Sequence, residues 1–195
     1  MQSSYVQTTL QAFADAIIPR TPRLAEEYGR IQYYGAIDLQ IDQFLIYELE
    51  HYPVPMALPT AELLNVAATA WLISQGYFGR GSLATLAPLD RLKAVTMLKQ
   101  QQVELTALPI IFQMDPELII RITDALNNYT IIGYYSEWSG YGTTKLLPPQ
   151  ERVMEFIPIS WKQVEYPGPS LGYRVLRPYR FDLTNIVLAA QGMQV

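Results

Sequence analysis

Residues 129–181 limit the possible folds of this chain more than any other part of the sequence. They make up 53 of its 195 positions, yet they contain 11 of its 23 aromatic residues and six of its 14 prolines. Prolines at this density interrupt helices and are excluded from central strands, whereas disordered segments are poor in aromatic residues. We therefore expect an ordered, extended segment.

Ordering such a segment carries a high entropic cost. Fixing about 50 residues costs at least about 50 kcal/mol, and burying 11 rings returns about 55 kcal/mol at about 25 cal/mol per Å². Because the two terms nearly cancel, the segment orders only if almost every ring finds a covering surface. We expect part of that surface to come from a second polypeptide; the alternative is a segment folded wholly onto its own helices.

The residues before this stretch have the periodicity of amphipathic helices. Apolar residues recur at steps of three and four in four segments, 6–17, 37–49, 60–71 and 89–98. Thr60 is expected to cap the third helix, and Asp115-Pro116-Glu117 to open the last one. The prediction is a mainly α protein, with a compact bundle of about five to six helices over residues 1–128 and a long extended aromatic and proline-rich arm over residues 129–195.

Composition excludes several classes of protein. The chain has no cysteine and a single histidine, so it offers no disulfide and no histidine cluster for a metal. Its net charge of −4 and pI near 5.0 lack the basic character of nucleic-acid-binding proteins. The longest apolar run, 66–73, is far shorter than the roughly 20 residues of a membrane-spanning helix. No signal peptide is visible, which predicts a cytoplasmic protein, with export to the cell envelope alongside a partner as the alternative.

Few residues have the arrangement that catalysis requires. His51 follows a predicted helix, where an imidazolium suits the negative helix end. Asp38 and Asp42 are four residues apart and are expected to share a solvated helix face. Residues 79–84 match a G-x-G-x-x-A pattern by letter, but a predicted helix rather than a strand precedes them. The sequence therefore predicts no catalytic residue, cofactor or metal in this chain.

Glycines alternate with aromatic rings in two parts of the arm, 133–142 and 166–173. Glycine allows close approach of the backbone, and tyrosine and tryptophan offer a large contact area with a polar tip, as in the hot spots of protein interfaces. The candidate partner interface consists of eight rings, namely Tyr134, Tyr135, Trp138, Tyr141, Trp161, Tyr166, Tyr173 and Tyr179. Such rings also stack on the apolar faces of sugars, which is the alternative role.

Three segments carry a family resemblance. They are the opening Leu10-Gln11-Ala12-Phe13-Ala14-Asp15-Ala16-Ile17-Ile18-Pro19-Arg20-Thr21-Pro22, the run at 133–142, and Tyr166-Pro167-Gly168-Pro169-Ser170-Leu171-Gly172-Tyr173. Together they resemble the gluconate 2-dehydrogenase subunit 3 family. The resemblance implies a small, helical, non-catalytic subunit that pairs with a large flavoprotein of the glucose-methanol-choline type, whose FAD oxidises a sugar or sugar acid. Family members commonly carry a twin-arginine signal, which is not visible here.

The resemblance and the expected arm together predict a hetero-oligomer. In this interpretation the chain is not itself an enzyme, and it stabilises and helps to assemble an FAD-dependent sugar or sugar-acid dehydrogenase. The alternative is a stand-alone carbohydrate-binding or carbohydrate-modifying protein with an aromatic-lined pocket.

Overall fold

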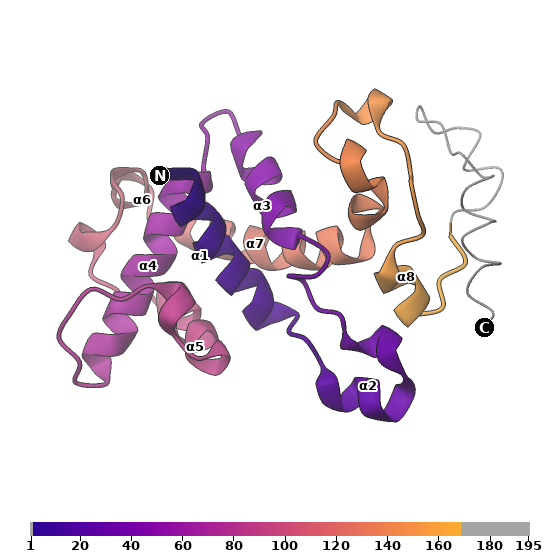
Figure 1. Ribbon diagram of the computed structural model, residues 1–195. Helices are drawn as coiled ribbons and strands as arrows, with labels where there is room; N and C mark the ends of the chain where they lie inside the picture. Colours follow the sequence, from indigo (N-terminus) through magenta and orange to yellow (C-terminus); the bar gives the residue numbers. More distant parts are fainter. Residues whose placement is uncertain (1, 169–195) are drawn as a thin grey trace. The chain divides into compact units, whose positions relative to one another are not determined.

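The computed structural model describes residues 2–168, and all regular secondary structure in that range is helical (Figure 1). The α-helices are α1 (Gln2–Ile17), α2 (Pro22–Tyr28), α3 (Ile41–Glu50), α4 (Ala57–Ser74), α5 (Pro88–Lys99), α6 (Ile110–Met114), α7 (Glu117–Tyr135) and α8 (Ile159–Gln163). Short 3-10 helices are η1 (Arg30–Tyr33), η2 (Leu83–Thr85), η3 (Leu105–Ala107), η4 (Trp138–Thr144) and η5 (Pro149–Glu151). The prediction of a mainly α protein is confirmed.

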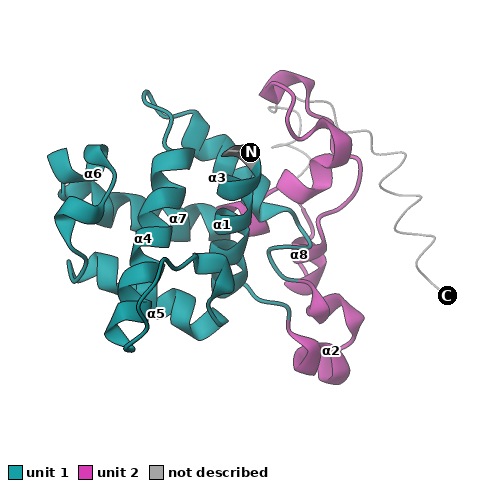
Figure 2. Cartoon of the chain, turned by 60° about the vertical axis from the view of Figure 1, so that its left-hand side comes forward, with its two compact units in different colours: residues 1–20, 35–131 teal, residues 21–34, 132–195 magenta. Residues whose placement is uncertain are grey.

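The chain divides into two compact units, which Figure 2 colours separately. Unit 1 contains residues 1–20 and 35–131, and unit 2 contains residues 21–34 and 132–195. The second boundary falls inside α7, close to the division that the sequence predicts after residue 128. No sequence pattern predicts that residues 21–34 belong to the same unit as the C-terminal part of the chain.

Unit 1 is built around α1 and α4. Helix α1 packs against α3, α4 and α5, and α4 also packs against α5. The large side chains that are fully buried in this unit are Leu10, Phe13, Ile41, Leu45, Leu49, Leu63, Leu64, Leu83, Leu98, Phe112 and Ile122. The apolar periodicity of the sequence therefore marks the buried faces of α1, α3 and α4, because residues three and four apart lie on one side of a helix. In α5 only Ala94 and Leu98 are buried, and Leu89 is exposed.

One predicted helix start is wrong. Helix α4 begins at Ala57, and Thr60 lies buried inside its first turn, where its amide donates a 2.9 Å hydrogen bond to the carbonyl oxygen of Met56. Pro59 makes this possible because proline is tolerated in the first turn of a helix, whose amides have no partner within the helix. Thr60, which the sequence predicted as a helix cap, is therefore a buried residue of the core.

The prediction of an extended arm is wrong for the part that the structure describes. Helix α7 continues to Tyr135, and η4, η5 and α8 follow it in unit 2. Pro149 is the first residue of η5, and Pro158 immediately precedes α8. Proline fits these positions because its fixed φ suits a helix start and its missing N–H leaves no donor unsatisfied there. The prolines thus separate short helices, and residues 169–195 lie outside the described part of the chain.

The structure tests the predictions for the single histidine and for the aspartate pair. His51 directly follows α3, and its ring Nδ1 is 2.6 Å from the carbonyl oxygen of Tyr47, so its place at the helix end is confirmed. The prediction that Asp38 and Asp42 share a solvated helix face is wrong. Asp42 is buried in the first turn of α3, where its carboxylate accepts a 3.1 Å hydrogen bond from Gln7 Nε2.

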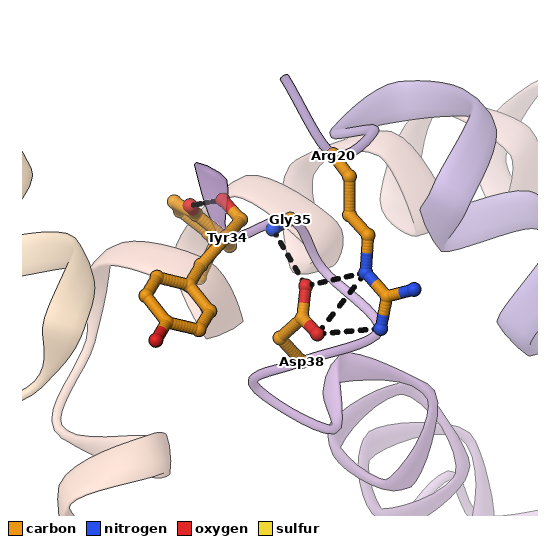
Figure 3. A network of polar contacts seen from close by, with 5 residues as sticks. Arg20, Tyr34, Gly35 and Asp38 are labelled. Atoms are coloured by element: carbon orange, nitrogen blue, oxygen red, sulfur yellow. Dashed lines mark hydrogen bonds and ion pairs between the residues drawn. The ribbon is translucent and has the colours of Figure 1, made fainter. Parts of the chain in front are cut away.

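Asp38 lies before α3 and holds together two stretches of unit 1 that are distant in the sequence (Figure 3). Its carboxylate accepts hydrogen bonds of 2.6–3.1 Å from the guanidinium of Arg20 and one of 3.0 Å from the amide of Gly35. The bond from Arg20 is the main reason why the pKa of Asp38 lies below its ordinary value of 3.8. The contacts tie Arg20, where the chain leaves unit 1, to Gly35, where it returns.

Replacing Asp38 by asparagine is expected to lower the free energy of unfolding by about 1–2 kcal/mol at neutral pH. Because folding lowers the pKa of this carboxyl, its contribution is present above the ordinary value of 3.8 and is lost as the pH falls through the lowered pKa. Urea denaturation at neutral pH and at acidic pH checks this prediction. The difference in the free energy of unfolding between Asp38→Asn and the wild type should be smaller at acidic pH. Asp124→Asn is the control, because its ion pair with Lys99 is about half exposed. A gap that does not depend on pH contradicts the prediction.

Candidate functional site

The predicted interface residues Trp138 and Tyr141 form the centre of an aromatic and cationic cluster in unit 2. Trp138 is only 2% exposed, and both the Lys145 ammonium and the Arg152 guanidinium carbon lie 5.8 Å from its ring centroid. The same Arg152 carbon is 5.9 Å from the ring of Tyr141. Cations at this distance are attracted to the face of an aromatic ring. The two rings are therefore part of the interior of unit 2.

The glycines of the run at 133–142 allow two segments of unit 2 to lie in direct backbone contact. The carbonyl oxygen of Gly140 accepts hydrogen bonds from the amides of Glu155, at 2.8 Å, and Phe156, at 3.3 Å. A Cβ at Gly140 would lie 2.6 Å from the Phe156 carbonyl oxygen. At Gly142, φ is +50° and a Cβ would overlap the Glu155 carboxylate, which accepts a 2.9 Å bond from the Thr143 amide. Close backbone approach, expected from the sequence, is therefore present.

Tyr134 belongs to a second buried cluster, which joins the two sequence segments of unit 2. Its hydroxyl lies 2.7 Å from the carbonyl oxygen of Tyr34 and 2.6 Å from Gln163 Oε1, and it donates its one proton to either. Gln163 Nε2 in turn donates to the carbonyl oxygens of Ile31, at 3.0 Å, and Tyr34, at 3.2 Å. The sequence analysis missed Gln163, because a single glutamine outside any motif gives no signal in the sequence.

Around Trp161, aromatic side chains remain accessible. The indole Nε1 of Trp161 donates a 2.7 Å hydrogen bond to the carbonyl oxygen of Tyr135, and the ring of Tyr166 stands edge-on to the Trp161 ring at 5.0 Å. Tyr135 is 47% exposed and Tyr166 45% exposed. Ile132, one turn earlier on α7, and Val164, after α8, are about half exposed. We call these four residues, Ile132, Tyr135, Val164 and Tyr166, the aromatic ledge.

The eight predicted interface rings therefore fall into three groups. Buried rings are Tyr134, Trp138, Tyr141 and Trp161; half-exposed rings are Tyr135 and Tyr166; Tyr173 and Tyr179 lie outside the described residues. The four buried rings find their cover in this chain, so the premise that they need a second polypeptide for burial is wrong. For the two rings of the ledge, contact with a partner stays a prediction.

Tyr129, the first ring of the aromatic stretch, belongs to unit 1 instead. Its hydroxyl oxygen is 3.1 Å from that of Tyr52 on the same unit. This hydrogen bond, together with partial burial, raises the pKa of Tyr129 to about 12, because both favour the neutral hydroxyl. The aromatic stretch thus contributes to both units.

Among the hollows in the described residues that are large enough to hold a small molecule, two have charged side chains in their walls. In unit 1, a cavity of about 650 Å³ is lined by Tyr5, Glu62, Asn65, Val66, Thr69, Arg80, Gly81, Ser82, Ala107, Leu108 and Pro109; we call it the α4 cavity. In unit 2, a hollow of about 390 Å³ is lined by Ala25, Glu26, Arg30, Tyr33 and Tyr34. The sequence analysis predicted neither, because their walls come from segments that only the fold brings together.

Two features are absent from the described residues. No helix among them is long and apolar enough to cross a membrane. No three histidine or acidic side chains among them lie close enough together to hold a metal ion.

Comparison with known proteins adds no relative. No family model, no curated protein and no solved structure matches this chain. The likeness to the gluconate 2-dehydrogenase subunit 3 family therefore rests on the three sequence segments alone.

Proposed function

We propose that this chain is a non-catalytic small subunit that binds and stabilises a large FAD-dependent dehydrogenase of the glucose-methanol-choline type. The observation that carries the proposal is the aromatic ledge, in which Tyr135 and Tyr166 both contact the buried Trp161 and keep about half of their own surface accessible. Interface hot spots are enriched in such half-buried tyrosines next to well-packed residues. The resemblance of three sequence segments supplies the identity of the partner.

The ledge is suited to binding because its rings are already held in place. The backbone carbonyl oxygen of Tyr135 accepts the bond from the Trp161 indole, and the amide of Tyr166 donates a 2.8 Å hydrogen bond to the carbonyl oxygen of Trp161. The ring of Tyr135 stands edge-on to that of Tyr134 at 5.0 Å, and the ring of Tyr166 stands edge-on to that of Trp161 at the same distance. A ring that is ordered before binding loses little conformational entropy when it meets a partner. In this proposal FAD and the reacting sugar or sugar acid both belong to the large subunit.

Changing either ledge tyrosine to aspartate is expected to weaken the complex strongly. The chain is co-expressed with a large flavoprotein of the glucose-methanol-choline type from the same source, and the amount of flavin that co-purifies is measured. We expect at least about a tenfold loss for Tyr135→Asp and for Tyr166→Asp, because each places a carboxylate in an apolar contact. Phe78→Asp is the matched control, since Phe78 is a 92% exposed ring in unit 1.

The control variant is expected to retain the flavin of the wild-type complex. Circular dichroism verifies that each variant is folded. If the ledge variants carry as much flavoprotein as the wild type does, or if the wild-type chain forms no complex, the proposal is wrong.

The alternative function, a stand-alone carbohydrate-binding protein, has one observation in its favour. Tyr33 and Tyr34 line the hollow of unit 2 together with the charged residues Glu26 and Arg30, and aromatic rings beside polar groups suit a sugar. These tyrosines are not among the rings that the sequence analysis selected. Saturable binding of glucose or gluconate to the isolated chain, lost in Tyr34→Ala, would favour this alternative over the subunit.

A further inference from the structure

The α4 cavity has the size and the lining of a small-molecule site. Its volume of about 650 Å³ lies within the range of roughly 300–1,000 Å³ that such sites occupy. One part of its wall is apolar, with Val66, Leu108 and Pro109, and another part carries the charged side chains of Glu62 and Arg80. A pocket with an apolar wall and a few polar groups selects ligands that have both characters.

The wall formed by residues 80–82 is held rigidly against α4. Thr69 Oγ1 accepts a 2.9 Å hydrogen bond from the amide of Gly81, and Asn65 Oδ1 accepts one of 2.7 Å from the amide of Leu83. A Cβ at Gly81 would lie 2.8 Å from Leu72 Cδ1 and 3.0 Å from the backbone of Ala68. Only glycine allows this contact, so the cavity is formed before any ligand arrives.

The two charges of the cavity do not neutralise one another. Within the described residues, the Glu62 carboxylate and the Arg80 guanidinium take part in no ion pair or side-chain hydrogen bond, although both line the same cavity. Asn65 and Thr69, by contrast, already use their polar atoms to hold the loop. The cavity therefore offers a ligand one negatively charged group, the Glu62 carboxylate, and one positively charged group, the Arg80 guanidinium.

The fold sets the spacing of the backbone segments that carry these two exposed side chains. Arg80 precedes Gly81, which is bonded to Thr69, and Thr69 is seven residues from Glu62 along α4. Seven residues of helix span about 10 Å. An extended chain of three residues spans a similar length, about 10 Å, between its amino and carboxyl ends.

We propose that the α4 cavity binds a short peptide of about three residues through both of its free ends. The Glu62 carboxylate receives the terminal ammonium, and the Arg80 guanidinium donates two hydrogen bonds to the terminal carboxylate, the arrangement that arginine and carboxylate favour. The peptide side chains lie against Val66, Leu108 and Pro109. The terminus of a long protein fits less well, because it supplies only one of the two charges.

Blocked peptides test the need for both ends. The full-length chain, without any flavoprotein, is titrated calorimetrically with trialanine, with N-acetyl-trialanine and with trialanine amide. We expect saturable binding of trialanine and at least about a fivefold weaker affinity for each blocked form, since each loses one charge-assisted contact. The amide resonances of residues 81 and 82 should shift in NMR spectra during the trialanine titration, whereas that of residue 29 should not.

Single charge changes identify the residues responsible. Glu62→Gln should weaken trialanine binding at least about fivefold and leave the affinity for N-acetyl-trialanine unchanged; Arg80→Gln should do the same with respect to trialanine amide. Glu117→Gln and Arg121→Gln, an exposed pair on α7, are the matched controls. The absence of saturable trialanine binding, or equal binding of the free and blocked peptides, overturns the proposal. Neither result bears on the flavoprotein complex, which is measured separately.

Discussion

Replacing Trp138 by alanine is expected to lower the free energy of unfolding by about 3–5 kcal/mol, the range for removal of a large buried ring. Trp138 is among the largest fully buried side chains of the chain, and the cations of Lys145 and Arg152 face its ring. Removing the ring leaves a cavity and also deprives these cations of their aromatic contact. The loss should appear in urea denaturation as a lower midpoint.

A second tryptophan supplies the control for this experiment. Trp71 on α4 is only partly buried, with the ammonium of Lys93 5.0 Å from its ring centroid, so Trp71→Ala should cost clearly less than Trp138→Ala. Trp138→Phe keeps an aromatic face and should recover part of the loss. In hydrogen exchange, peptides from residues 138–162 should exchange faster in Trp138→Ala. If both alanine variants lose the same stability, Trp138 is not the centre of unit 2.

The burial of Trp138 shows where an energetic argument from sequence fails. The estimate compares the entropic cost of ordering residues 129–181 with the free energy gained by burying their rings. It treats these residues as one extended segment, in which only long-range contacts can cover a ring. The chain instead forms η4, η5 and α8, whose turns satisfy backbone groups locally, and the rings of Trp161 and Tyr166 meet edge-on. Tyr134, for example, is covered with the help of residues 31–34, a segment whose position no local pattern reveals.

Local signals predicted those parts of the fold that depend on neighbours in sequence. The apolar periodicity identified the buried faces of α1, α3 and α4, and Asp115-Pro116-Glu117 marked the start of α7. In α5 it did so less well, because Leu98 is buried but Leu89 is 64% exposed. Gly140 was correctly interpreted as a site of close backbone approach, whereas Gly142 has a positive φ and lies against the side chain of Glu155. By contrast, the buried cluster of Tyr134 and Gln163 and the α4 cavity combine residues from distant segments. The sequence alone does not show which of these segments come into contact.

Replacing Gly35 by alanine is expected to destabilise unit 1 by about 3 kcal/mol, at the upper end of the usual cost of adding a methyl group to a packed site. A Cβ at this position would lie 2.6 Å from the carbonyl carbon of Pro19, 2.7 Å from the Arg20 nitrogen and 2.8 Å from the Ile18 oxygen. All three atoms belong to the backbone, which cannot turn away as a side chain can. The two segments must therefore separate.

This separation has consequences that a simple local clash would lack. The amide of Ala36 donates a 2.9 Å hydrogen bond to the Ile18 carbonyl oxygen, and Arg20 pairs with Asp38 beside it. Both contacts lengthen if the segments move apart, so the Ala36 amide should lose protection from hydrogen exchange in Gly35→Ala.

Gly79→Ala is the matched control for Gly35→Ala, because a Cβ at Gly79 meets no atom within 4 Å and its φ is not positive. That change should be neutral or slightly stabilising, since alanine restricts the unfolded chain more than glycine does. Equal thermal stability of Gly35→Ala and Gly79→Ala would show that residues 18–20 yield to a methyl group. In that case the contact between the two segments of unit 1 is looser than the 2.6 Å approach requires.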